Sequence, residues 1–111
     1  MSSYPSTDDC YRIMREEKLS SAVIRHCCAV NAVAMVIARR VGADLDLVNA
    51  ASLLHDIGRS ATHGVNHVAE GVRIAKEHGL PGDLVKCIGR HIAAGFTFEE
   101  AEALGLPRGD Y

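Results

Sequence analysis

The chain has 111 residues, 48% of them hydrophobic, and a formal net charge of -2 at pH 7. This length suits one domain with a single core, and the composition excludes an intrinsically disordered chain, which combines low hydrophobicity with high net charge. The basic residues are scattered along the chain. This pattern excludes the clustered positive charge that proteins need to bind long nucleic acids. We therefore expect one globular domain over residues 1–111 that binds no long nucleic acid.

The N-terminal stretch lacks the basic head, apolar run and cleavage site of a signal peptide. The longest apolar region, Ala29 to Ala38, is shorter than the roughly 20 residues that span a bilayer. The four cysteines form no CxxC pair, and two of them are neighbours in a helical pattern, which favours reduced thiols over disulfides. These features predict a cytoplasmic protein with no membrane partner.

The apolar residues recur with helical period along the chain, which predicts an all-α bundle of five to six helices. Helix-starting and helix-ending residues predict helices over residues 8–18 (N-cap Ser6 or Thr7), from Ser20 or Ser21 to Gly42, from Asp44 or Asp46 to Gly58, from Asn66 to Gly79, over residues 82–92 behind Pro81, and over residues 97–105. The first helix is the most polar and is expected on the outside. The second is apolar around most of its circumference and is expected at the centre.

One histidine lies on the inward stripe of the second helix. His26 shares that stripe with Ala22, Val30, Val33 and Ile37, so its imidazole is expected to point toward the core. A lone inward histidine is more often a hydrogen-bonded core residue than a ligand. His55 and Asp56 change that expectation, because a carboxylate at the end of an apolar helix goes inward only when it is paired or bound to metal.

Two more histidines belong to this pattern. His67 opens the fourth helix, where Gly71 lets another helix approach closely, and His91 lies on the apolar stripe of the fifth. The predicted metal ligands are therefore His26, His55, Asp56, His67 and His91. Imidazole and carboxylate without thiolate suit Mn, Fe, Co, Ni, Zn or Mg, and five ligands can hold one divalent ion, or two ions with a bridging water.

The motifs resemble the HD-domain superfamily of metal-dependent phosphohydrolases, in its HDIG subgroup. The matching residues are His26, the HDIG sequence from His55 to Gly58, the HxxxG sequence from His67 to Gly71, and His91 in the following helix. The resemblance implies an α-helical fold with the metal between helices, metal-dependent attack of water on a phosphoester, and frequent action on nucleotides.

The C-terminal end departs from the family pattern. Members that bind metal usually supply a final aspartate from a helix beyond the last histidine, whereas this chain ends in LPRGDY. Asp110 is the only aspartate after His91, and we do not expect it to be a ligand. Either the sequence is cut short relative to a natural protein, or a partner chain completes the site, or this member binds metal weakly.

The catalytic residues expected from this pattern are Asp56, Arg59 and His63. Asp56 is a candidate general base as well as a ligand. Arg59 is either a phosphate clamp or a solvated loop charge, and His63 either donates to the leaving group or is simply exposed. The expected substrate is a phosphomonoester or phosphodiester of a nucleotide-like small molecule. The alternatives are a non-catalytic binding or regulatory module and a di-iron oxygenase. A homodimer is compatible with the apolar second helix, although no residue pattern specifies one.

Overall fold

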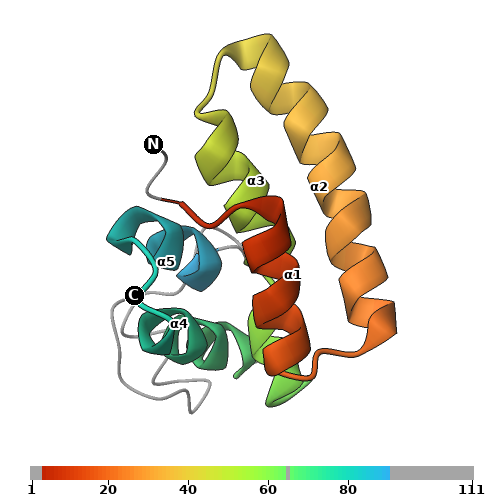
Figure 1. Ribbon diagram of the computed structural model, residues 1–111, viewed down its shortest axis with the longest axis vertical. Helices are drawn as coiled ribbons and strands as arrows, with labels where there is room; N and C mark the ends of the chain where they lie inside the picture. Colours follow the sequence, from red (N-terminus) through yellow and green to blue (C-terminus); the bar gives the residue numbers. More distant parts are fainter. Residues whose placement is uncertain (1–3, 65, 91–111) are drawn as a thin grey trace.

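The computed structural model describes residues 4–64 and 66–90, and all the regular structure in those residues is helical. Its elements are α1 (Thr7–Glu16), α2 (Ser21–Val41), α3 (Leu45–Leu54), the short 3-10 helix η1 (Ile57–Ser60), α4 (His67–Glu77) and α5 (Gly82–Gly89), as Figure 1 shows. The predicted all-α bundle is confirmed. The helix predicted over residues 97–105, and the end of the one predicted over 82–92, lie outside the described residues.

Local capping chemistry fixes the starts of α1, α2 and α3. Ser6 and Asp9 form a capping box, in which the hydroxyl of Ser6 accepts from the N–H of Asp9 and the carboxylate of Asp9 accepts from the N–H of Ser6, both at 3.1 Å. Ser20 and Asp44 each accept a hydrogen bond from the backbone N–H three residues further on. Gly42 ends α2 in the left-handed region at φ 70°, as its position predicts.

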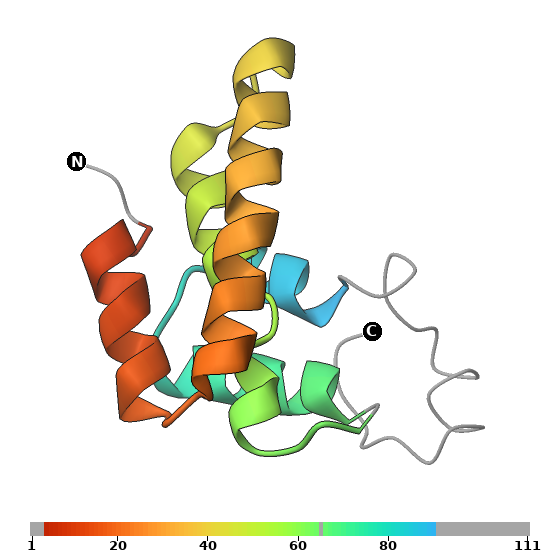
Figure 2. The same cartoon turned by 90° about the vertical axis from the view of Figure 1, so that its right-hand side faces the viewer.

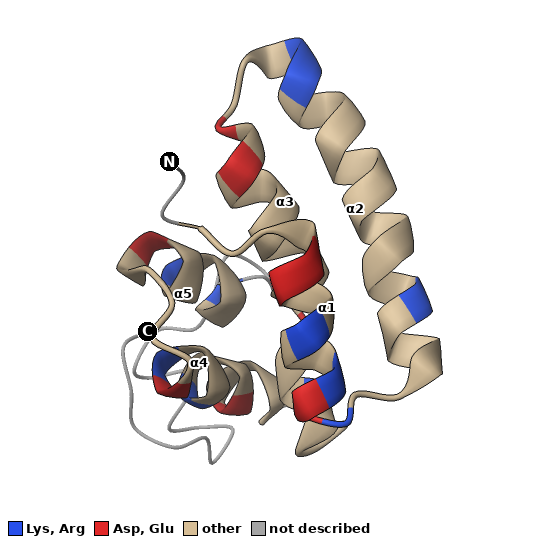
Figure 3. Cartoon of the chain, in the orientation of Figure 1, with Lys and Arg blue, Asp and Glu red and all other residues tan. Residues whose placement is uncertain are grey.

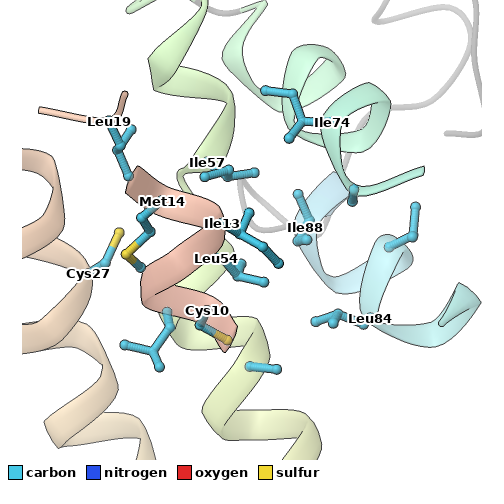
Figure 4. Packing of buried hydrophobic residues seen from close by; sticks show 14 residues of the cluster. Cys10, Ile13, Met14, Leu19, Cys27, Leu54, Ile57, Ile74, Leu84 and Ile88 are labelled. Carbon is cyan, nitrogen blue, oxygen red and sulfur yellow. The ribbon is translucent and has the colours of Figure 1, made fainter. Parts of the chain in front are cut away.

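The polar helix α1 lies on the outside of the bundle, as predicted, with one apolar face turned to the core (Figure 2). Its residues Cys10, Ile13 and Met14 are buried, and they belong to a core that includes Leu54, Ile57, Ile74, Leu84 and Ile88 (Figure 4). These three residues occur at helical spacing i, i+3, i+4 and form one apolar stripe. A narrow stripe is enough to anchor an outer helix whose other faces are polar and exposed.

The apolar helix α2 lies at the edge of the bundle, so the prediction that it is central is wrong. It packs mainly along α3 (Figures 1 and 2), and only Cys27 and Ala38 of α2 are buried. By its residue count α2 is about 31 Å long and α3 about 15 Å, so α3 covers only part of it. The large hydrophobic residues of α2 that stay exposed are Val33, Val36, Ile37 and Val41.

Among the described helices, α2 alone is long and apolar enough to cross a bilayer, and 11% of its apolar window is buried. Length and composition are weak support for a span, because helices of soluble cores pass the same test. In this fold α2 carries arginines near both ends (Figure 3) and is joined to α3 by polar side chains. The cytoplasmic location stays a prediction.

The join between α2 and α3 is a half-buried amide contact. The side-chain N–H of Asn31 donates to Oδ1 of Asn49 at 3.0 Å and to Oγ of Ser52 at 2.8 Å. Ser52 in turn donates to the carbonyl of Asn49 at 3.1 Å. These bonds fix the spacing of the two helices that carry the candidate ligands.

The chain leaves the α-helical path directly after α3. This helix ends at Leu54 and not at Gly58 as predicted, because Asp56 adopts φ -103°, ψ 18° and η1 follows. The short 3-10 turn tightens the backbone at the helix end. As a result the side chain of Asp56 points into the protein while the chain turns toward α4.

Candidate metal centre

The carboxylate of Asp56 is the centre of the candidate site, with a side chain only 3% exposed. Its Oδ2 atom lies 3.1 Å from Nε2 of His26 and 3.3 Å from Nε2 of His55. Nε of Arg59 is 3.2 Å from the same oxygen, and Nε2 of His67 is 3.4 Å from Oδ1. Side chains from α2, the end of α3, η1 and the start of α4 thus meet at one carboxylate.

Backbone carbonyls orient two of the imidazoles. Nδ1 of His55 lies 2.6 Å from the carbonyl oxygen of Ser52, and Nδ1 of His67 lies 2.9 Å from that of Gly64. A carbonyl oxygen only accepts, so each Nδ1 carries the hydrogen. In the neutral ring the lone pair is therefore on Nε2, which faces Asp56.

This tautomer makes the site a cluster of electron-pair donors. Each of the two Nε2 lone pairs lies within 3.4 Å of an oxygen of the Asp56 carboxylate, and the two groups repel one another unless a cation or a proton lies between them. Metal-binding histidines commonly donate their second N–H to a carbonyl or carboxylate in this way. His26, His55 and Asp56 offer ligand atoms that all lie within 4.8 Å of one another, so the donor set fits a divalent ion.

The pKa of His55 reflects the same surroundings. Burial lowers it, but the hydrogen bonds with Asp56 and the Ser52 carbonyl and the charge of Asp56 outweigh burial, so the pKa is raised overall. The protein thus favours positive charge at this imidazole. That preference is met either by a proton or by a metal ion at Nε2.

The site is closed on the α4 side and open on the α2 side. The side chain of His67 is 5% exposed and that of His55 is 14% exposed, whereas His26 is 55% exposed. The expectation that His26 points into the core is wrong, because α2 lies at the edge of the bundle and its His26 stripe faces the rim of the site. A ligand can therefore reach Asp56 from the side of His26.

Two glycines allow η1 and α4 to approach. A β-carbon on Gly58 would lie 1.7 Å from the carbonyl oxygen of His67 and 2.6 Å from the backbone nitrogen of Gly71. A β-carbon on Gly71 would lie 3.0 Å from a methyl group of Ile88. The predicted role of Gly71 in close helix approach is confirmed. The absent side chain of Gly58 lets η1 pack directly on α4, which brings Asp56 next to His67.

The other sequence-predicted site residues divide into two groups. His63 is exposed in the loop before α4. His91 lies outside the described residues, as does Asp110. Sequence reasoning missed the two orienting carbonyls, of Ser52 and Gly64. The signal that could have found them is that each stands three residues before a candidate ligand, at a helix end where carbonyls and N–H groups lack helical partners.

Comparison with known families decides the class of this fold. The HD domain family matches residues 23–104, which is most of the chain. The chain belongs to the HD domain family. The match includes the second helix with His26, the HDIG sequence and α4. Membership in the HDIG subgroup remains a prediction from the four residues at 55–58.

Curated proteins that resemble this HD domain carry several different names. It is 41% identical over 107 residues to a tRNA (cytidine(56)-2'-O)-methyltransferase of Picrophilus torridus, covering 96% of this chain and 31% of the relative. It is 44% identical over 97 residues to the uncharacterized protein MJ0778 of Methanocaldococcus jannaschii, covering 83% of this chain and 57% of the relative. It is 33% identical over 72 residues to ribonuclease Y of Cutibacterium acnes, covering 62% of this chain and 13% of the relative.

This HD domain thus spans about a third of the methyltransferase relative and just over half of the Methanocaldococcus protein. No solved structure matches the chain. The similarity therefore establishes the family, whereas the activities named for the longer relatives belong to those proteins.

Proposed function

We propose that this HD domain is a metal-dependent phosphohydrolase that cleaves a phosphoester of a nucleotide-like small molecule. The observation that carries the proposal is the division of the Asp56 carboxylate, with Oδ2 beside His26 and His55 and Oδ1 beside His67. Imidazoles on both oxygens suit a carboxylate that is shared between two ions, or that holds one ion firmly. The HD superfamily is one of hydrolases, which supports the reaction class.

The residues that would hold the metal are His26, His55, Asp56 and His67, with His91 as a predicted further ligand. A bound ion such as Mn, Fe, Co, Ni, Zn or Mg would polarise the phosphoryl oxygen and lower the pKa of bound water toward neutrality. His55 and His67 are fixed by backbone carbonyls and hold their rings in place without rearrangement.

Arg59 is the proposed phosphate clamp. Its Nε contacts Asp56 at 3.2 Å, and its side chain is one third exposed at the open side of the site. A guanidinium carries further N–H donors in a plane, which match the oxygens of a phosphate. Arg59 can therefore orient Asp56 and meet a phosphate with the same group.

Proton transfer is assigned to two residues. Asp56 is the proposed general base, because it is the carboxylate at the centre of the site. His63 is the proposed donor to the leaving group, because it is exposed in the loop that leads into α4. The matching experiment compares turnover in wild type and in His63→Ala, which should lose more activity on a substrate with a poor leaving group than on one with a good leaving group.

A non-catalytic module is the second candidate function. It is favoured by the relatives that match nearly the whole chain, since two of them are named for methyl transfer and this domain is a third of their length. In that case the HD fold would bind a nucleotide or RNA phosphate without cleaving it. Because some relatives are named ribonuclease Y, the substrates that are tested should include a short RNA.

Phosphate release from nucleotides and a short RNA, with each candidate metal added in turn, tests the proposal. We expect turnover in wild type and a loss of about 100-fold or more in His55→Ala, because even residues that only orient a ligand contribute 10–100-fold. His78→Ala is the matched control, because this histidine lies outside the metal centre, where its ring hydrogen-bonds to Glu17 at 3.0 Å. Absence of turnover with every metal and substrate would favour the non-catalytic module.

A further inference from the structure

His26 separates two hollows of different chemistry. On one side a cavity of about 310 Å³ is lined by Ala22, Val23, His26 and Arg59. On the other side a groove of about 490 Å³ runs between α2 and α3 and also reaches His55. The α2–α3 groove, as we name it, has an apolar lining that includes Val30, Ala34, Leu47, Val48 and Ala51.

The groove and the metal centre form one continuous site. Val30 and Ala34 follow His26 by one and two helical turns on the same stripe of α2. Ala51 and Val48 precede His55 on α3, which runs back along α2. The groove therefore extends about 12 Å from the imidazoles, at 1.5 Å of rise for each of eight residues. That length exceeds the distance from the phosphate to the near edge of the base in a nucleoside monophosphate, so the groove has room for the whole base.

The lining of the groove offers contact area and little hydrogen bonding. Among its described lining residues none carries a permanent charge. The hydroxyl of Ser52 already accepts from Asn31 at 2.8 Å and donates to the carbonyl of Asn49 at 3.1 Å. A base in the groove would therefore be held by its faces, and the groups on its edge would remain in water.

The inner end of the groove is aromatic. The rings of His26 and His55 lie 5.3 Å apart between centroids and are tilted by 60°. Ring faces favour a flat aromatic ligand over a flexible alkyl chain. The hollow that contains the guanidinium of Arg59, on the far side of His26, is the matching place for the phosphate.

We propose that the α2–α3 groove is the base-binding part of the substrate site and that it accepts nucleoside monophosphates without selecting the base. The phosphate end of this assignment rests on the proposed hydrolase function, and the base end rests on the groove alone. Purines bind more tightly than pyrimidines because they bury more area, and adenine and guanine bind alike because their edges are not read.

Binding of adenosine, which carries no phosphate, tests the groove separately from hydrolysis. We expect ligand-observed NMR to show saturation transfer to the base protons in wild type and weaker binding, by about tenfold or more, in Ala34→Phe, whose ring fills the groove. Ala32→Phe is the matched control, because Ala32 is exposed on the opposite face of α2. Circular dichroism checks that both variants fold. Wild-type affinity in Ala34→Phe, or equal competition by hexyl phosphate, would overturn the inference.

Kinetics on AMP, GMP, UMP and ribose 5-phosphate separate the two proposals. The groove predicts KM values for AMP and GMP within about tenfold of each other and a much higher KM for ribose 5-phosphate, since an apolar pocket discriminates weakly among similar groups. Equal use of AMP and ribose 5-phosphate would remove the base site and leave the hydrolase. Adenosine binding that is lost in Ala34→Phe, in a protein that cleaves nothing, would support the base site and remove the hydrolase.

Discussion

Gly58 lies directly against the backbone of His67. A β-carbon on Gly58 would lie 1.7 Å from the His67 carbonyl oxygen, far inside van der Waals contact. This contact joins η1, which carries Arg59, to the first turn of α4, which carries a candidate ligand. Gly58, the fourth residue of the HDIG sequence, is therefore required because any side chain there would push η1 away from α4.

Gly58→Ala is expected to destabilise the fold and separate Asp56 from His67. Overfilling a packed site generally costs about 1–3 kcal/mol, and a clash with backbone belongs at or above the upper end. Urea unfolding followed by circular dichroism measures the change. Gly82→Ala is the control, because a β-carbon there meets nothing within 4 Å. Equal stability of the two variants would contradict this role of Gly58.

The helix starts were predictable from sequence because their causes are local. Ser6, Ser20 and Asp44 cap their helices through bonds that span three residues, so spacing alone reveals them. The placement of α2 was not predictable in this way. Burial depends on which surfaces a helix meets, and the apolar face of α2 extends beyond the shorter α3.

The candidate site shows the same division. Periodicity singled out His26 and the HDIG sequence, but it assigned His26 to the core although more than half of its side chain is exposed. The convergence on Asp56 depends on the turn after Leu54 and on the contact of Gly58 with α4. These are tertiary relationships between segments far apart in the chain, which helical spacing does not encode.

Two thiols are expected to be inert in the folded protein. Cys10 and Cys27 are fully buried, and burial raises the pKa of Cys10 from 9.0 to about 12 and that of Cys27 to about 11. We expect iodoacetamide at pH 8 to modify Cys87, which is exposed, and to spare Cys10 and Cys27 until urea unfolds the chain. Mass spectrometry of native and unfolded samples shows the difference. Rapid native labelling of Cys10 would be inconsistent with this core.

The same pKa values predict an alkaline loss of stability. A thiol whose pKa is raised by folding holds its proton more firmly in the native state. Its contribution to the free energy of unfolding is complete below the ordinary value of 9.0 and is lost as pH rises toward about 11 for Cys27 and about 12 for Cys10. Urea unfolding at pH 8 and pH 10.5 should show the decrease, and an unchanged free energy would contradict burial of these thiols.

The exposed face of α2 is the expected contact surface of a homodimer. Val33 and Val36 stay exposed on the flank of α2 that turns away from Ala34 and the α2–α3 groove, and the arginines lie toward the helix ends (Figure 3). Val36→Glu should shift the mass measured by light scattering from dimer to monomer, because it buries a charge in an apolar interface. Arg73→Glu is the control, because it adds a glutamate to the exposed face of α4, away from the proposed interface. A wild-type monomer at high concentration would rule out the dimer.

The metal content of the protein tests the central claim most directly. Wild type and Asp56→Asn are dialysed against Mn²⁺, Co²⁺ or Zn²⁺ and then against metal-free buffer. The bound metal is measured by elemental mass spectrometry. Asp46→Asn, at an exposed aspartate, is the control. If His26, His55, Asp56 and His67 form a metal centre, wild type and Asp46→Asn retain at least about one ion per chain and Asp56→Asn loses most of it. Equal retention in wild type and Asp56→Asn, or none in either, would contradict the account.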